Sequence, residues 1–566
     1  MQVQNSQILD PAGLPVPQAI IDSVKAQANV TGMGTGGNLW HPAYHAAGLD
    51  AQDTVKWWPT RSSADATVLP AKDLTLARVR DVIRNDPVAH AAIEKLVDLI
   101  VGPGLRLSAK PDGVALGIED PKVLRKFARE IQAEWRLFAE DPRRLCDAQR
   151  KLSMNGLFRL FVRTWLTCGE TTSVLTWRDG PNQRYATCVL AVDPDRLSNP
   201  NGLYETPTLR GGVEMDPFGA PIAYHVRNAH IGDWWDAERA WTWTRVPRAT
   251  KWGRPVFIHG FEPERENLSR AISPFAALIT RLRMIGKFAD SELASAAANA
   301  LFAAFVESDL PVEEVSQRLA PQAATYADKM VDFYTKHPAM VGGVRIPVML
   351  PGSKISMNAS PRQTATFASF QTAFLQSIAS ALGLSYEQLS MDWSKTNYSS
   401  ARAALNEVWR SVRRMSSVFV EQVVTPIYHA VIEEAFDKGY LVIPPGTRLI
   451  TAANDNGLDA FHMMPGAILR ARWIGPGRGY VDPVKEAEAA ALRMESMIST
   501  LEKECAEQGD DYEEILDQIQ IEEQDLKDRG LTRLSLVAAV QANKGAKPDS
   551  EEATGPAGPG GEAKAA

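Results

Sequence analysis

Cysteine is scarce in this chain of 566 residues, which has only Cys146, Cys168, Cys188 and Cys505. No two of them form a Cys-x-x-Cys pair, so the spacing typical of a zinc site is missing. Few, scattered thiols are typical of proteins from a reducing compartment such as the bacterial cytosol. We therefore expect structural thiols, no bound metal and no other cofactor.

Long apolar runs are also lacking. No stretch of about 18 apolar residues occurs, so no transmembrane helix is predicted and no membrane partner is expected. The N-terminus lacks the basic and apolar regions of a signal peptide. Positive charge is not in excess, because 61 Lys and Arg residues face 68 Asp and Glu residues, a net charge of −7. Binding of nucleic acid would therefore depend on local basic surfaces.

Motifs of common catalytic sites are missing too. The sequence contains no G-x-x-x-x-G-K-[ST] phosphate-binding loop, no H-E-x-x-H pair and no nucleophile elbow. The nine histidines are scattered, and we interpret His259, before Gly260, as a buried hydrogen-bonding residue rather than a base. These absences predict a protein that is not an enzyme.

The first half of the chain shows a mixture of helix and strand patterns. Residues 1–70 are rich in Gly, Pro, Asn and Ser and predict an N-terminal arm that is partly flexible. Apolar residues at helical spacing predict helices in 76–100, 123–138 and 157–166, the first interrupted at Pro87. From 181 to 262 short alternating runs predict strands. This pattern predicts an α+β domain with a small β-barrel or sandwich.

Two long helices follow. Ser273 and Pro274 are a helix cap and a first helical residue, and the apolar stripe continues to about residue 306. A second helix is predicted over 361–382, with a short α/β insert between the two. A helix of about 30 residues is about 45 Å long, and a bundle or a ring of subunits buries such a helix more readily than a monomer does.

Residues 382–410 connect the second long helix to a third. The second helix is expected to end at Gly383, and the third to begin near Asn397 and to be kinked at Pro426. The polar, aromatic loop between them carries Lys395. From this pattern alone, the loop could hold a DNA backbone, a phosphate ligand or nothing. Further on, strands are predicted in 440–480, and residues 501–530 are acidic, with twelve Asp and Glu against three Lys and Arg.

The amino-acid sequence of several segments resembles that of a known protein family. The run LGLSYEQLSMDWSKTNYSSARAALNEVWR at 382–410 is similar to the signature segment of the lambda-type portal proteins of tailed bacteriophages. The likeness extends in the family's order over about residues 40–535. It includes RNDP at 84–87, LIVGPG at 99–104, DPDRLS at 193–198, WGRP at 252–255, HGF at 259–261, residues 302–308, WIGPGRG at 473–479 and DP at 482–483.

The resemblance implies the portal fold: an α/β wing with a small β-barrel, a stem hairpin of long helices, an α/β clip and a helical crown, assembled as a ring. The implied parts are an arm (1–70), wing (71–272), first stem helix (273–308), clip (309–357), second stem helix (358–384), tunnel-loop region (385–398), long wing helix with returning wing strands (399–483), acidic crown (484–535) and disordered tail (536–566).

The resemblance also implies a function. Portal proteins form a ring of twelve copies at one capsid vertex, nucleate head assembly, and pass double-stranded DNA during packaging and ejection. The implied partners are further copies of the chain, DNA, the terminase large subunit, head-completion or adaptor proteins, the major capsid protein and the scaffold. The implied location is the virion, with the host cytoplasm during assembly.

The candidate DNA-contacting residues lie in the implied tunnel loop, and Lys395 is the foremost of them. A ring of single cations would give weak, nonspecific phosphate contacts. The loop residues are Asp392, Trp393, Ser394, Lys395, Thr396, Asn397 and Tyr398, and the possible basic lumen or intersubunit residues are Arg281, Arg283, Lys287, Arg402 and Arg410.

Two other function classes stay open from the sequence. Residues 245–287 hold nine Lys and Arg against three Asp and Glu, so a DNA-processing enzyme subunit could use them as a basic face, although solvated helix faces and ion pairs explain the same charges. A capsid or scaffold protein other than a portal is the third reading. Cleavage of a plasmid in the presence of Mg²⁺ would distinguish the enzyme from a portal protein. The number of subunits in the ring would distinguish another capsid or scaffold protein from a portal protein.

Overall fold

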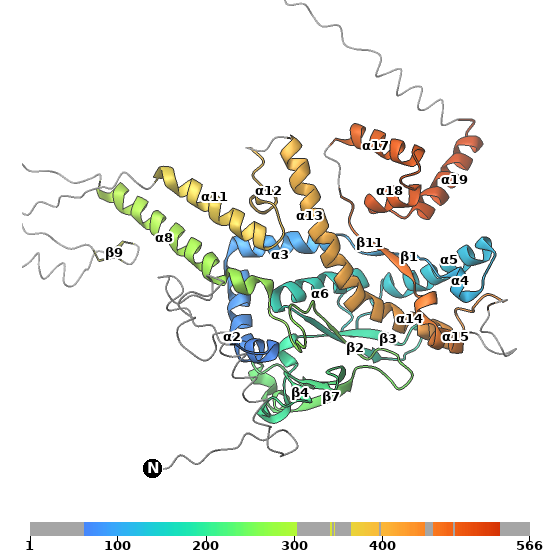
Figure 1. Ribbon diagram of the computed structural model, residues 1–566, viewed down its shortest axis with the longest axis horizontal. Coiled ribbons are helices and arrows are strands. Elements are labelled where there is room, and N and C mark those ends of the chain that lie inside the picture. The colour runs from blue at the N-terminus through green and yellow to red at the C-terminus, as the bar shows by residue number, and fades with distance from the viewer. Residues whose placement is uncertain are drawn as a thin grey trace, which may run out of the picture. The chain divides into compact units, whose positions relative to one another are not determined.

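The computed structural model describes residues 61–302, 340–341, 344–345, 364–394, 398–445, 447, 457–478 and 482–531. The chain divides into two compact units, Met1–Thr67 and Val68–Ala566. The described residues form both helices and sheets, which confirms the mixed class (Figure 1). Within the described residues, no helix is long and apolar enough to span a bilayer.

The N-terminal helices follow the predicted periodicity. The pair Asp86-Pro87 separates the first two, because the Asp86 carboxylate accepts hydrogen bonds from the backbone N–H groups of Val88 and Ala89 and so caps the second helix. The helices are α2 (Ala64–Asn85), α3 (Pro87–Ile100), α4 (Gly113–Leu116), α5 (Pro121–Ala139) and α6 (Met154–Cys168). Helix α2 begins inside the stretch predicted as an arm, where the Ser63 hydroxyl accepts from the backbone N–H of Ala66.

Two antiparallel sheets replace the predicted barrel. The first has the order β3-β2-β8 and the second β4-β5-β6-β7, and among the described residues no strand pairing closes either of them, so the barrel prediction is wrong. The rings of Tyr224 and Phe257 stack at 4.1 Å and join the sheets through a small apolar cluster. The strands are β2 (Thr171–Trp177), β3 (Thr187–Val192), β4 (Leu209–Arg210), β5 (Val213–Met215), β6 (Pro221–Arg227), β7 (Trp243–Pro247) and β8 (Phe257–Gly260).

Short helical turns connect these strands. They are η2 (Pro194–Arg196), η3 (Pro200–Gly202), η4 (Trp234–Asp236) and α7 (Ala237–Ala240). None of them was predicted, because three- and four-residue turns carry no periodic signal.

The long helices α8 (Ile279–Phe302) and α11 (Thr364–Ala381) lie side by side in Figure 1. Arg281 contacts Ser377, and Phe288 contacts Phe370. Residue numbers therefore rise along α8 while those of the contacted residues fall along α11, so the two helices are antiparallel. Ser273 caps the entry, as predicted, but the first turn is the 3₁₀ helix η5 (Pro274–Leu278). Of the predicted insert, only β9 (Met340–Val341) and β10 (Val344–Arg345) are described.

The main core surrounds the C-terminal half of the third long helix. This helix consists of α13 (Tyr398–Phe419), the π-helical turn η6 (Val420–Val424) and α14 (Thr425–Asp437), so the interruption predicted at Pro426 takes the form of a π turn just before it. Nine residues of α14 are buried, and the helix packs against α5, β3 and α15. Trp135, Tyr428 and Trp473 meet edge to face at 5.2 to 5.7 Å.

The remaining elements partly depart from the prediction for residues 440–480. In the described part of this segment, helices α15 (Leu458–Met463) and α16 (Pro465–Ile468) precede one strand, β11 (Ala471–Ile474). This strand pairs with β1 (Arg106–Ala109) and not with the earlier sheets. The acidic C-terminal segment forms three helices, α17 (Pro483–Glu495), α18 (Leu501–Glu507) and α19 (Tyr512–Asp528).

Candidate functional site

The segment between α11 and α13 is built on a buried frame. Gly383 has a left-handed φ of +70°, which ends α11 as predicted. A reciprocal capping box of Ser385 and Gln388 then starts the short helix α12 (Tyr386–Ser390). Leu384 and Leu389 are buried in the main core and hold this segment in place.

The described part of the candidate loop is exposed and locally ordered by one carboxylate. Asp392 Oδ1 accepts hydrogen bonds from the Ser394 backbone N–H at 3.0 Å and from the Ser394 hydroxyl at 2.6 Å. The side chain of Trp393 is 41% exposed. Lys395, Thr396 and Asn397 lie outside the described residues, and Tyr398 is the first residue of α13.

The five candidate basic residues come from two helices. Arg281, Arg283 and Lys287 lie on α8, and Arg402 and Arg410 lie on α13; all five are exposed. Arg281 donates to the Ser377 hydroxyl of α11. Arg410 pairs with Glu407 of its own helix at 2.6 Å.

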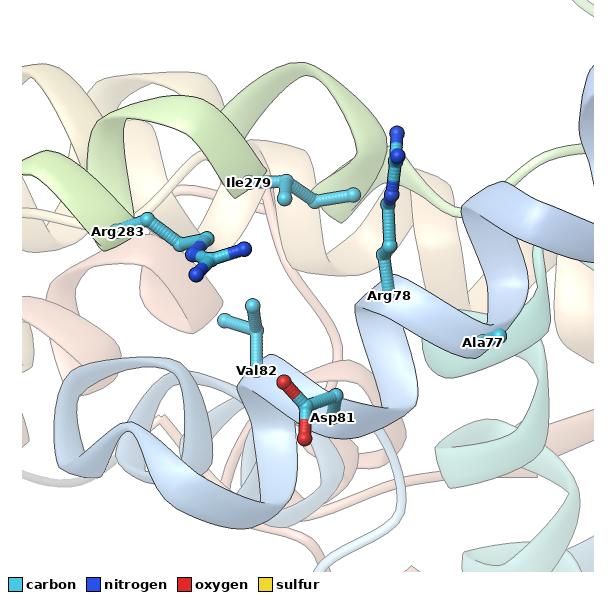
Figure 2. Close-up of a pocket in the computed structure, with 6 residues that line it drawn as sticks. All are labelled: Ala77, Arg78, Asp81, Val82, Ile279 and Arg283. Atoms are coloured by element: carbon cyan, nitrogen blue, oxygen red, sulfur yellow. The ribbon is translucent and has the colours of Figure 1, made fainter.

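Arg283 also lines a cavity of about 210 Å³ between α2 and α8 (Figure 2). Ile279 lines it from α8, as Arg283 does. Arg78, Asp81 and Val82 line it from α2. The Asp81 carboxylate accepts a hydrogen bond from Asn85 at 2.8 Å. Two cations and one carboxylate around an apolar floor do not define a ligand class.

The basic run at 245–287 does not form one basic face. Arg245 pairs with Glu214 at 2.7 Å, and Arg254 pairs with Glu433 at 3.0 Å. Arg270 is buried against Glu170. Three of the nine cations are therefore neutralised by acids from separate elements, and the surface that would favour a DNA-processing enzyme is reduced.

Glu170 is the centre of a buried charge network that the sequence did not reveal. Its carboxylate is fully buried and contacts Arg270, Lys72 at 3.1 Å and His259 at 3.0 Å. Burial alone would raise the pKa of Glu170, but the charges of Arg270 and Lys72 hold that pKa well below its usual range. His259 is thus a buried hydrogen-bonding residue, as predicted, and burial lowers its pKa.

Arg270 also ties the network to the loops around it. Its guanidinium donates to the backbone carbonyls of Leu197, Gly211 and Pro194. The network therefore joins α2, β2, β8 and the start of the second sheet, and its role is structural. No local pattern indicates this network, because Lys72, Glu170 and Arg270 are about a hundred residues apart in the chain.

A second group has the composition of a metal site but is already neutralised. Ligand atoms of Asp193, Asp195 and His230 lie within 4.8 Å of one another. Arg80 pairs with both carboxylates at 2.7 Å, and His230 Nε2 lies 3.2 Å from Asp195. The guanidinium stands where a cation would bind, so we interpret the group as an ion-pair cluster that fixes α2 to the DPDRLS segment.

Residues 51–415 match the family model described as phage portal protein, lambda family. The chain is 31% identical to the portal protein of Escherichia phage N15, over 90% of this chain and 95% of that one. It is 30% identical to portal protein B of Escherichia phage lambda, over 88% of this chain and 93% of that one.

Among solved structures, the neck of a native GTA particle covers 79% of this chain and 98% of its own at 13% identity, with a TM-score of 0.35. A score this low supports no argument about the fold. The family match over residues 51–415 and the two relatives do identify the family, and they span the candidate loop. The chain belongs to the lambda family of phage portal proteins.

Proposed function

We propose that this chain is the portal subunit of a tailed phage, a structural protein of the virion that assembles in the host cytoplasm. Copies form a ring at one capsid vertex, nucleate the capsid and conduct double-stranded DNA during packaging and ejection. Terminase large subunit, head-completion proteins, major capsid protein and scaffold are its proposed partners. The observation that carries the proposal is the family match, which extends over about nine-tenths of the chain in two relatives named as portal proteins.

The proposed parts follow the described elements. Helices α8 and α11 are the stem, and α2 to β8 with α13, α14 and β11 are the wing. Helices α17 to α19 are the crown. The clip at 309–357, most of the arm at 1–70 and the tail at 536–566 lie outside the described residues, apart from β9, β10 and residues 61–70.

Ring formation is supported by the uncovered apolar side chains of the helix pair. Met284 and Leu293 of α8 are 55% and 72% exposed, and Phe370 of α11 is 46% exposed. Such side chains gain about 25 cal/mol for each Å² of apolar surface removed from water. Neighbouring copies around a ring would cover the pair from both sides.

Weak DNA contact is the proposed role of residues 392–398. Lys395 directly follows residues 391–394, which come after the buried residues Leu384 and Leu389, and Asp392 is three residues before it in the sequence. One cation per copy with an acid nearby gives phosphate contacts that are weak and sensitive to salt. A moving duplex requires contacts of this kind, since strong ones would arrest it.

Native mass spectrometry with electron microscopy tests the assembly. We expect a closed ring, twelve-fold in the virion, with a central opening wide enough for a duplex. A particle that stays monomeric at every concentration, or an assembly without an opening, would overturn the proposal.

The variant Lys395→Ala tests the channel assignment separately. We expect intact rings with less DNA packaged or retained, because the phosphate contacts are lost. Lys251→Ala removes an exposed cation from the connection between β7 and β8 and is the matched control. Equal packaged length and titre in both variants would reject the role of Lys395 and leave the ring proposal standing.

A further inference from the structure

The strands β1 and β11 present a row of cations on their outer side. Side chains alternate along a strand, and paired residues of antiparallel strands point to the same side. Arg106, Ser108 and Lys110 therefore share one side with Arg472, the partner of Ser108. Leu107 and its partner Trp473 point to the other side, into the main core.

Helix α5 extends this row. Arg129, Gln132 and Arg136 are spaced by three and four residues, so they lie on one face of the helix. Gln132 donates to the backbone carbonyl of Leu107 at 3.0 Å, which holds that face beside β1. The result is a basic face made of Arg106, Lys110, Arg129, Arg136 and Arg472.

The acidic helices α18 and α19 cover this basic face. Arg129 contacts Glu513 at 3.0 Å and Asp517 at 3.3 Å, and Lys110 contacts Glu502 at 3.1 Å. The other pairs are Arg106 with Asp510 at 3.2 Å and Glu514 at 3.6 Å, Arg136 with Glu514 at 3.4 Å, and Arg472 with Glu502 at 3.9 Å.

The cover is held by little besides charge. Helix α19 has no buried residue, and the only buried residue of α18 is Glu504. Neither hydrophobic cluster among the described residues includes a residue after Trp473. Gly475 and Gly477 pack closely against Gln508 and Gly509, and the Arg478 backbone N–H donates a hydrogen bond to the Glu507 carbonyl. One further ion pair, between Arg413 of α13 and Glu507 at 3.5 Å, also holds α18. Exposed ion pairs of this kind exchange readily with ions in solution.

We propose that the basic face binds the phosphate backbone of double-stranded DNA, and that α18 and α19 cover it as a detachable acidic substitute for that backbone. A row of carboxylates at ion-pair distance from five cations occupies the positions that phosphates would take. DNA and the acidic helices compete for one surface, so each weakens the hold of the other. This inference rests on the proposed function, since it needs DNA to reach the subunit.

The experiment measures binding of the full-length protein to a fluorescent duplex of about 30 base pairs, which covers several phosphate contacts. Glu513→Gln with Glu514→Gln weakens the cover without touching the basic face. The matched control, Asp525→Asn with Asp528→Asn, changes the net charge equally on the same helix, at exposed carboxylates that pair with no body residue in the described chain. Hydrogen exchange of α19 is recorded for each sample.

We expect the cover variant to bind DNA about fivefold more tightly at low salt, and the control to bind nearly as the parent does. Amides of α19 should exchange faster when duplex is added. Adding Arg129→Gln and Arg136→Gln to the cover variant should abolish the gain. Equal gains in cover variant and control would show a general charge effect and overturn the proposal, as would faster exchange of α19 without any gain in affinity.

Ring formation is read from the same samples by native mass spectrometry. Rings that form with unchanged DNA affinity reject only the covered face. Failure of the parent protein to form rings rejects the proposed function itself.

Discussion

Two regions of the molecule place carboxylates against several cations, and they do so in opposite surroundings. Glu170 is fully buried between β2 and β8, where it contacts Arg270, Lys72 and His259. Glu513 and Glu514 meet Arg129, Arg106 and Arg136 at the surface, where these arginines are about half exposed. The contact distances are similar, so burial and not geometry separates the two regions.

The difference decides what each region does. A buried charge without its partners costs several kcal/mol, so the Glu170 network must be complete for the domain to fold. Water and ions can replace an exposed partner at almost no cost. The first arrangement fixes the relative positions of elements that are distant in sequence, and the second holds an element that is able to leave.

The largest effect is expected from Glu170→Ala. The substitution leaves Lys72 and Arg270 buried without their carboxylate, and we expect a loss of about 3 to 5 kcal/mol in the free energy of unfolding. Urea denaturation of parent and variant measures it, with Glu513→Ala as the surface control. Similar midpoints for the two variants would remove the contrast between the regions.

A smaller loss is expected from Glu434→Gln, a buried carboxylate on α14. It accepts from the backbone N–H groups of Ala186 at 2.6 Å and Thr187 at 2.9 Å, and it pairs with Lys438 at 2.7 Å. An amide nitrogen cannot accept these bonds, so we expect a loss of about 1 to 3 kcal/mol. Asp437→Asn, at an exposed position three residues further along the same helix, is the control and should change the unfolding midpoint little.

Acid should weaken the buried network before it breaks the fold. The pKa values of His259 and Glu170 are both lowered, so the unfolded chain binds more protons than the folded one as pH falls. The contribution of these two groups to the free energy of unfolding is therefore fully present above about pH 6.5. It declines first as His259 becomes protonated, and it declines further below about pH 4.5 as Glu170 becomes protonated. Thermal unfolding between pH 7 and pH 5 measures this, and His259→Gln should flatten the slope; an unchanged slope would contradict the assignment.

The smallest effect is expected from Arg129→Ala. It removes two exposed ion pairs, and we expect a change of less than about 1 kcal/mol that fades as salt is added. Thermal unfolding at low and high salt measures it beside Arg163→Ala, which removes the exposed pair with Glu94 elsewhere on the body. A loss as large as that of Glu170→Ala would mean that α19 is fixed as firmly as the core.

Local patterns predicted the helices well. Asp86-Pro87, Ser273-Pro274 and Gly383 mark boundaries through bonds made within a few residues, and the structure has each boundary at that place. The barrel was wrong because strand partners are chosen by contacts far apart in sequence. For the same reason the strand pattern in 440–480 did not reveal that β11 pairs with β1.

The candidate site was predictable only in part. The short helix before the loop is started by the capping box of Ser385 and Gln388. The sequence of residues 382–410 resembled the family that the family model then matched. The roles of Lys395 and the five basic residues stay predictions. The Glu170 network and the covered basic face were not predicted, because each consists of residues from three or more elements that are far apart in the sequence.

The π turn at Val420–Val424 has a consequence for the orientation of α13. A π turn holds one residue more than the α-helical repeat, and one residue corresponds to about 100° of rotation around a helix. Deleting a single residue there would let α13 and α14 fuse into one regular rod, and everything N-terminal to the turn would swing by about a quarter of a circle. The wide turn therefore sets the rotation of α13 relative to α14, and length changes at residues 420–424 should be tolerated far less than substitutions.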